Sequence, residues 1–133
     1  MSRILYDGNY MKIYVSHAKK SPFEEELYAP LKTSGLPIEF IFPHDKNPDP
    51  FNAKELFEGK TCDLVLAEVS YPATGQGIEL AWANANNIPI VCIYKKGVDI
   101  SWSLKLLTDK FIEYENEQDM IRKITTELGL NIA

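Results

Sequence analysis

The stretch from Cys62 to Ala85, CDLVLAEVSYPATGQGIELAWANA, contains an apolar run, a glycine-bearing turn and the start of a helical pattern. The run from Leu64 to Ala67 is bounded by turn residues and predicts a buried strand of a parallel sheet. Gly75 and Gly77 allow the backbone to approach a ligand closely where the helix opens. Free N–H groups and the positive end of the helix dipole meet there, so the turn can hold an anion without a basic side chain.

The same stretch contains one carboxylate, Glu79, which we expect in the first turn of this helix. The helix dipole favours the charged form of a carboxyl group at that position, so we expect Glu79 to be ionised. An ionised carboxylate beside a pocket can be a nucleophile, a base or a clamp for hydroxyl groups. A glutamate that only complements the dipole is an equally open interpretation of this segment alone.

Length and composition indicate one domain with an ordinary core. The chain has 133 residues, of which 45% are hydrophobic and 25% charged, and no apolar run approaches the ~20 residues of a membrane span. The N-terminus lacks the pattern of a signal peptide. We expect residues 1–10 to be a leader, an extension at the sheet edge or a cloning remnant, and residues 11–133 to form the domain. Cys62 and Cys92 favour reduced, buried thiols in a cytoplasmic protein over a disulfide or a metal site.

Charge excludes some classes of partner. A formal net charge of −5 argues against a protein that binds nucleic-acid polymers, but it is compatible with a small anionic ligand. Two lysine pairs, Lys19 with Lys20 and Lys95 with Lys96, each follow an apolar strand. They are either solvated surface or a source of attraction for a phosphorylated ligand at one edge of the sheet.

Apolar runs alternate with helical patterns along the chain. We predict strands at about 11–16, 38–42, 63–69, 88–94 and 111–114, and helices at about 22–34, 52–59, 76–87 and 117–128. This alternation is typical of an α/β fold, here a flavodoxin- or Rossmann-like three-layer sandwich with a five-stranded parallel sheet in the order 2-1-3-4-5. Ser21 is the expected cap of the first helix, and residues 43–50, PHDKNPDP, are expected to be loop.

Ligands bind at the carboxyl ends of parallel strands where the strand order reverses. The side chains that we expect at this edge are Ser16, His17, Lys19, Ser70, Thr74, Glu79, Lys95 and Ser103. Glu68 is expected at a strand end, bonded to backbone or to sugar hydroxyls, because a buried unpaired carboxylate is costly. No third metal ligand accompanies His17 and His44 at a recognisable spacing, so we expect no zinc site. Aromatic side chains that could stack on a base are Tyr14, Trp82 and Trp102.

Residues 63–83, DLVLAEVSYPATGQGIELAWA, resemble the nucleoside 2-deoxyribosyltransferase family, whose pattern is an aspartate-led apolar strand, a turn with Pro and Gly, and GxGxE entering a helix. The most similar branch is the 2′-deoxynucleoside 5′-monophosphate N-glycosidases, and the register holds without gaps from about Glu55 to Ser103. The resemblance implies an enzyme that cleaves or transfers at the glycosidic bond of a (deoxy)nucleoside or its 5′-monophosphate, without a cofactor or metal.

The resemblance also implies site residues and a partner. Glu79 falls on the nucleophile, Glu55 on the upstream acid that assists it, and Ser103 on a serine that binds 5′-phosphate from the neighbouring subunit. The implied substrate-binding positions are Ser16, His17, Lys19, Asp63, Ala73, Thr74, Gly75, Gly77 and Ser103. Such sharing implies a homodimer or higher homo-oligomer, for which the helix around Trp82 offers an apolar face.

The sequence departs from the family pattern at several positions. Glu55 stands where the family usually has Asp, and Ala73 stands where the N-glycosidase branch has a small hydroxyl, with Thr74 adjacent. Gln76 occupies a position that is often apolar. These departures keep open an alternative, a catalytically weak nucleotide-binding or sensing module of the same fold. A flavodoxin-like receiver or flavoprotein is disfavoured, because a receiver needs an acidic cluster after the first strand and this chain has SHAKKS there.

The proposed chemistry also fits the residue types. Breaking an N-glycosidic bond builds positive charge at C1′ of the sugar, and a carboxylate beneath the sugar can trap that carbon covalently. Glu79 is the candidate for this role. The departing base needs a proton, and a second acid such as Glu55 can deliver it or hold the sugar hydroxyl and the nucleophile in line.

Overall fold

The structure is a computed structural model that describes residues 5–6, 9–45 and 52–130. Of the loop expected at 43–50, Pro43 to Asp45 lie in an irregular turn, whereas residues 46–50 lie outside the described residues. The expectations for residues 1–4 and 7–8 also lie outside them.

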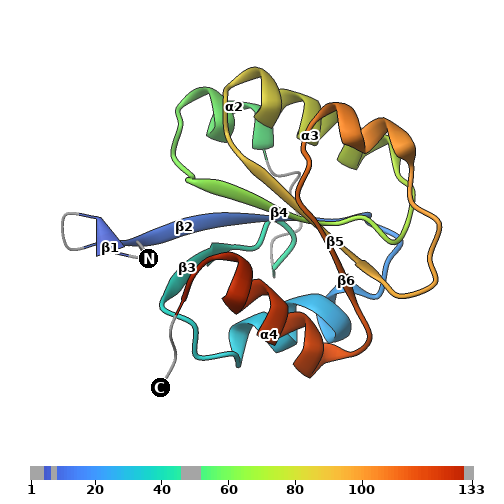
Figure 1. Ribbon diagram of the computed structural model, residues 1–133. Coiled ribbons are helices and arrows are strands. Elements are labelled where there is room, and N and C mark those ends of the chain that lie inside the picture. The colour runs from blue at the N-terminus through green and yellow to red at the C-terminus, as the bar shows by residue number, and fades with distance from the viewer. Residues whose placement is uncertain (1–4, 7–8, 46–51, 131–133) are drawn as a thin grey trace.

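The described part of the chain forms a six-stranded sheet. The strands are β1 (Leu5–Tyr6), β2 (Asn9–Ser16), β3 (Ile38–Ile41), β4 (Leu64–Glu68), β5 (Ile90–Lys95) and β6 (Phe111–Tyr114). Five of them are parallel and lie in the order β3-β2-β4-β5-β6, which confirms the predicted order 2-1-3-4-5. The sixth, β1, lies within residues 1–10, for which an extension of the sheet was one of three expectations. It pairs antiparallel with the start of β2 at the end of the sheet that protrudes in Figure 1.

Helices cover both faces of this sheet (Figure 1). They are the π-helix η1 (Glu24–Tyr28), α1 (Ala29–Lys32), α2 (Ala53–Glu58), α3 (Thr74–Ala85), the 3₁₀-helix η2 (Trp102–Leu106) and α4 (Glu117–Glu127). In Figure 1 α2 and α3 lie on one side of the sheet and α4 on the other, so the three-layer architecture is confirmed. In the described residues no helix is both long enough and apolar enough to cross a membrane.

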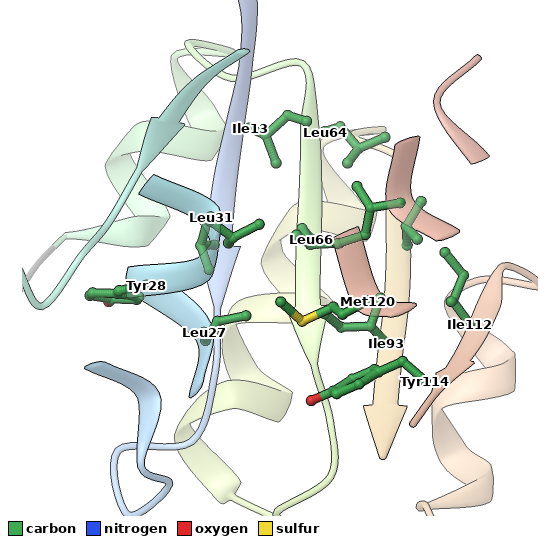
Figure 2. Packing of buried hydrophobic residues seen from close by; sticks show 13 residues of the cluster. Ile13, Leu27, Tyr28, Leu31, Leu64, Leu66, Ile93, Ile112, Tyr114 and Met120 are labelled. Carbon is green, nitrogen blue, oxygen red and sulfur yellow. The ribbon is translucent and has the colours of Figure 1, made fainter. Parts of the chain in front are cut away.

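Two apolar cores, one on each face of the sheet, follow from the alternation of side chains along the strands. In β2, Ile13 packs into the core under α4, where Met120 lies (Figure 2), and Tyr14 packs into the core under α3, to which Leu80 also belongs. All four of these side chains are fully buried. Fully burying an aliphatic side chain of this size contributes about 1.5–3 kcal/mol, so both layers are held by ordinary hydrophobic burial.

The first helix differs from the prediction of one helix over 22–34 capped by Ser21. Ser21 Oγ donates to the carbonyl of Ala18 at 2.7 Å and does not cap the helix. The helix starts as a π-turn, in which the N–H of Ala29 donates to the carbonyl of Glu24. Pro30 has no N–H and its ring clashes with a regular α-helical carbonyl one turn back, which explains the wider turn before it.

Cys62 and Cys92 are free and buried, as predicted. Burial raises the pKa of the Cys62 thiol to about 11 and that of the Cys92 thiol to about 12. Both thiols are therefore neutral near pH 7 and behave as small apolar side chains.

Candidate functional site

The centre of the candidate site is the carboxylate of Glu79. Its Oε2 accepts a hydrogen bond from the hydroxyl of Tyr14 at 2.8 Å, and its Oε1 accepts one from Ser16 Oγ at 3.0 Å. Both donors lie on the same face of β2, two residues apart, near the carboxyl end of the strand. The fold thus brings together a helix residue and two strand residues that lie more than sixty positions away in the chain.

Glu79 lies in the second turn of α3, and the prediction of the first turn is wrong because the helix begins at Thr74. Burial raises the pKa of the Glu79 carboxyl, and the hydrogen bonds from Tyr14 and Ser16 lower it in part. The pKa of Glu79 is raised overall, so burial outweighs the helix dipole, contrary to the expectation from the sequence. The groups that favour the charged carboxylate here are the two hydroxyl donors.

Tyr14 is a candidate site residue whose place the sequence analysis misjudged, since it was considered as a side chain that could stack on a base. Its side chain is fully buried, and its ring packs edge-on against Phe57 of α2 with the centroids 5.2 Å apart. Burial and the nearby Glu79 raise the pKa of its phenol, so the hydroxyl stays protonated and donates. A signal for this role was available in the sequence. A tyrosine in a buried strand needs a partner for its hydroxyl, and Ser16, two residues later, presents a second hydroxyl on the same face of the strand.

Glu55 lies in the first turn of α2 and is exposed. Its carboxylate Oε2 accepts a hydrogen bond from Asn52 Nδ2 at 3.2 Å, and its backbone N–H donates to Asn52 Oδ1 at 3.0 Å. These two contacts form a reciprocal cap of α2. Phe57, on the same helix, packs against the ring of Tyr14, so α2 contacts one of the two residues that donate to Glu79.

A cavity of about 450 Å³ lies between α3 and η2. It is lined by Val69, Tyr71, Pro72, Ala73, Thr74, Gln76, Gly77, Leu80, Ser101, Ser103, Leu104 and Leu107. The structure therefore brings Ala73, Thr74, Gly77 and Ser103 together within one chain. Glu79 and its two donors are not among the lining residues, because Glu79 faces β2 while the cavity faces η2.

Gly75 and Gly77 leave the backbone at the start of α3 open. A Cβ atom added to either glycine would meet no heavy atom within 4 Å, and neither has a positive φ. Glycine inside a helix costs about 1 kcal/mol relative to alanine, and neither packing nor backbone geometry within the described chain requires it here. The open backbone is thus available to a ligand or to another chain.

Asp63 is not brought to this region. It precedes β4, at the amino end of the strand, and its carboxylate accepts a hydrogen bond from the backbone N–H of Lys12 at 2.8 Å. Ser16 lies opposite Ala67, four residues further along, which places Asp63 on the order of 13 Å from the carboxyl edge. Its observed contact joins two strands.

His17 is buried, and both of its ring nitrogens are within hydrogen-bonding distance of a partner. His17 Nδ1 lies 2.9 Å from the carbonyl of Ala18, which can only accept, so Nδ1 donates. In the neutral ring Nε2 then accepts, and Tyr28 Oη donates to it at 2.7 Å while accepting from the backbone N–H of His44 at 3.1 Å. The ring stacks on Phe23 with the centroids 4.2 Å apart. Burial lowers the pKa of His17 to about 4, so this is a neutral histidine of a packed aromatic cluster.

The basic residues are mostly paired within the chain. Lys95 Nζ lies 2.5 Å from Glu26 Oε1 and 2.7 Å from the hydroxyl of Tyr71, and Lys96 pairs with Glu115 at 2.9 Å. Lys19 is exposed in the turn that follows β2. Of the two interpretations of the lysine pairs, these contacts favour ordinary surface pairing for Lys95 and Lys96. In the part of the chain that the structure describes, no three His, Cys, Asp or Glu side chains are grouped so as to hold a metal ion.

Comparison with known proteins adds named relatives, although no family model matches the chain. A protein of Syntrophotalea carbinolica with the name "Putative 2′-deoxynucleoside 5′-phosphate N-hydrolase 1" is 35% identical over 72 residues, which cover 46% of this chain and 51% of the relative. The chain thus spans about half the length of the curated relative that it matches.

Two solved structures share the fold. The Clostridium botulinum CMP N-glycosidase BcmB has a TM-score of 0.57 at 21% identity, over 85% of this chain and 97% of its own. A conserved protein from Enterococcus faecalis V583 has a TM-score of 0.60 at 16% identity, over 89% of this chain and 99% of its own. At these identities the structures show the fold alone, and the named relative adds similarity of sequence. The sequence similarity to this relative confirms the resemblance to the nucleoside 2-deoxyribosyltransferase family that residues 63–83 indicated, and the two structures confirm the fold.

Proposed function

We propose that the chain cleaves the N-glycosidic bond of a nucleoside 5′-monophosphate, with Glu79 as the nucleophile. The observation that carries this proposal is the partly buried carboxylate of Glu79, held between the hydroxyls of Tyr14 and Ser16 near the carboxyl edge of the sheet. The names of the relatives support it, since one is named as a 2′-deoxynucleoside 5′-phosphate N-hydrolase and one as a CMP N-glycosidase.

The chemistry proceeds in two steps. A bond forms between a Glu79 carboxylate oxygen and C1′ while the bond from C1′ to the base nitrogen breaks, and the electron pair leaves with the base. Glu55, when protonated, is the proposed donor of the proton that the base takes up. Water then attacks C1′ while the bond from C1′ to the Glu79 oxygen breaks, and the proton that the water loses returns to Glu55. This step releases the sugar phosphate and restores the Glu79 carboxylate. A second base in place of water gives transfer, which is the other outcome that the family resemblance implies.

We assign the 5′-phosphate to the cavity between α3 and η2. The N-terminal N–H groups of α3, the open backbone at Gly77 and the hydroxyls of Thr74 and Ser103 all border this cavity. Within one chain Ser103 and Glu79 face different sides of α3. This separation supports an assembly in which the whole cavity, Ser103 included, holds the phosphate of a nucleotide whose sugar lies at the Glu79 of a neighbouring subunit.

The test is chromatographic detection of free base after incubation with ribo- and deoxyribonucleosides and their 5′-monophosphates, with and without an acceptor base. We expect base release from monophosphates, and we expect Glu79→Gln to abolish it while the fold persists. Glu39→Gln, an exposed strand glutamate, is the matched control and should leave turnover unchanged. Turnover that survives Glu79→Gln would sink the assignment of the nucleophile.

A second candidate is a nucleotide-binding or sensing module with weak catalysis. The observation that favours it is the capping contact of Glu55 with Asn52, which engages the carboxylate proposed as the acid. Nucleotide binding without base release from any member of the panel would support this module, whereas a fall of about a hundredfold in an active enzyme on Glu55→Gln would support the acid role.

A further inference from the structure

Glu68, the last residue of β4, is a buried carboxylate outside the Glu79 cluster. Its side chain is only 6% exposed. Oε1 accepts a hydrogen bond from the backbone N–H of Ser70 at 2.8 Å, and Oε2 accepts from Ser70 Oγ at 2.7 Å and from the hydroxyl of Tyr114. Burying a carboxylate is costly unless donors satisfy it, and these three donors do so.

The contacts of Glu68 fix the turn between β4 and α3 at both of its ends. Ser70, at the start of the turn, is bound by the side chain, and Ser70 Oγ also accepts from the backbone N–H of Lys95 at 2.8 Å. Gln76, in the first turn of α3, donates from Nε2 to the backbone carbonyl of Glu68 at 2.9 Å. Ser70 and Gln76 are themselves buried, so water does not compete freely for these bonds.

Tyr114 connects this turn to the opposite layer of the molecule. Figure 2 shows Tyr114 at the end of the core under α4, with its hydroxyl oxygen pointing out of the cluster. Its ring packs among residues of that core, and burial and Glu68 raise the pKa of its phenol, so it remains a donor. The turn that leads to Glu79 on one face of the sheet is thus anchored by a residue from the other face.

The surroundings of Glu68 leave no room for a substrate. The void bordered by Glu68, Tyr71, Tyr114 and η1 is about 10 Å³, which is close to the volume that one water occupies. Lys95 closes this side, because its Nζ lies 2.5 Å from Glu26 Oε1 and 2.7 Å from the hydroxyl of Tyr71. Glu68 therefore acts on its neighbours and not on a ligand.

We infer that Glu68 is a positioning residue, which together with Tyr114 fixes the turn 69–76 and thereby holds the first turns of α3, including Glu79, in register with β2. The catalytic consequence of this inference rests on the proposed function. Its structural consequence, an ordered start of α3, does not.

Amide hydrogen exchange tests the structural consequence without any substrate. The probe is the N–H of Gly77, which donates to the carbonyl of Ala73 at 3.1 Å, and the reference is the N–H of Val65 in the core of the sheet. In Glu68→Ala we expect exchange at Gly77 to be about tenfold faster while Val65 is unchanged. Glu68→Gln keeps an acceptor for Ser70, so it should retain part of the protection that Glu68→Ala loses. Tyr114→Phe removes only one of the three donors to Glu68, so it should also lose only part of the protection.

Equal acceleration at Gly77 and Val65 would overturn the inference, because it would indicate general destabilisation, and so would unchanged exchange at Gly77. Glu39→Gln is the control and should alter neither amide.

Turnover tests the catalytic consequence. If the wild-type chain releases base, Glu68→Ala should lower kcat per folded molecule by about tenfold or more, with Glu68→Gln in between. Faster exchange at Gly77 with an unchanged kcat would overturn the link between Glu68 and Glu79. If the wild-type chain releases no base, the proposed function fails, and the exchange measurement alone decides whether Glu68 positions the turn.

Discussion

At the scale of single residues, the hydroxyl of Tyr14 influences the protonation of Glu79, and Tyr14→Phe removes it while the ring stays in place. Tyr14→Phe keeps the ring against Phe57 but removes a hydrogen bond that favours the ionised carboxylate. We expect the pKa of Glu79 to rise further, so the acid limb of the pH profile of kcat/KM moves to higher pH. Base release measured across the acidic and neutral range checks this, and an unmoved limb would contradict it.

His17 makes stability depend on pH. Its pKa is about 4 in the folded chain and about 6.5 when exposed, so the unfolded chain binds the proton first as the pH falls. Stability is therefore full above about pH 6.5 and falls towards pH 4, by at most about 3 kcal/mol. Urea unfolding at several pH values checks the slope.

The lowered pKa of His44 acts in the same direction, and the raised pKa of Glu79 acts in the opposite one. Comparison with His17→Gln isolates the contribution of His17, because only that variant lacks its titration. An identical slope of stability against pH in the variant would show that His17 does not cause the pH dependence.

At the scale of elements, the glycines of α3 lower the stability of the helix but leave its backbone accessible. Gly77→Ala adds a methyl group that meets no atom within 4 Å, so we expect it to stabilise the helix by about 0.5–1 kcal/mol and to raise Tm. Because we place the phosphate at this backbone, KM for the monophosphate should rise while KM for the free nucleoside does not. Thermal unfolding and KM for the two substrates check both parts, and an unchanged KM ratio would move the phosphate elsewhere.

Elements with strong local signals were predictable from the sequence. The buried strands were indicated by their apolar runs, and α2 was predicted at about residues 52–59, where the structure has Ala53–Glu58 with Asn52 as its cap. The first helix was not predictable in detail, because Ser21 bonds to the preceding turn and Pro30 widens the helix before it. Both effects depend on neighbours that a capping pattern does not include.

The site was predictable only as far as one segment carries it. The turn and Glu79 lie within residues 62–85, so their spacing was visible in the sequence. The bonds from Tyr14 to Glu79 and from Tyr114 to Glu68 join residues 65 and 46 positions apart. Such pairs depend on strand order and on side-chain packing, which local periodicity does not contain.

At the scale of the whole molecule, exposed apolar side chains gather on η2, where Trp102 is 68% and Leu106 85% exposed. On α3, the helix that was expected to offer an apolar face, Trp82 is partly buried against the core and Ile78 is 46% exposed. We expect the chain to self-associate through η2, because Ser103 lies on the same element. Leu106→Glu should then shift the chain towards the monomer and lower turnover of the monophosphate.

Sedimentation velocity combined with base release checks the assembly. Tyr10→Glu is the matched control, since Tyr10 is an exposed aromatic residue at the far end of β2 and should leave both measurements unchanged. A wild-type monomer with full activity would contradict a shared site.

The two buried thiols make the chain convenient for fluorescence experiments. Because both are buried and have pKa values of about 11 and about 12, Cys62 and Cys92 do not compete for a maleimide dye near neutral pH. A cysteine introduced at Tyr10 would carry the dye alone, on the order of 20 Å along β2 from Ser16. Energy transfer between dyes on separate copies would then report subunit exchange during turnover. The dye would leave Glu79, the proposed nucleophile, undisturbed.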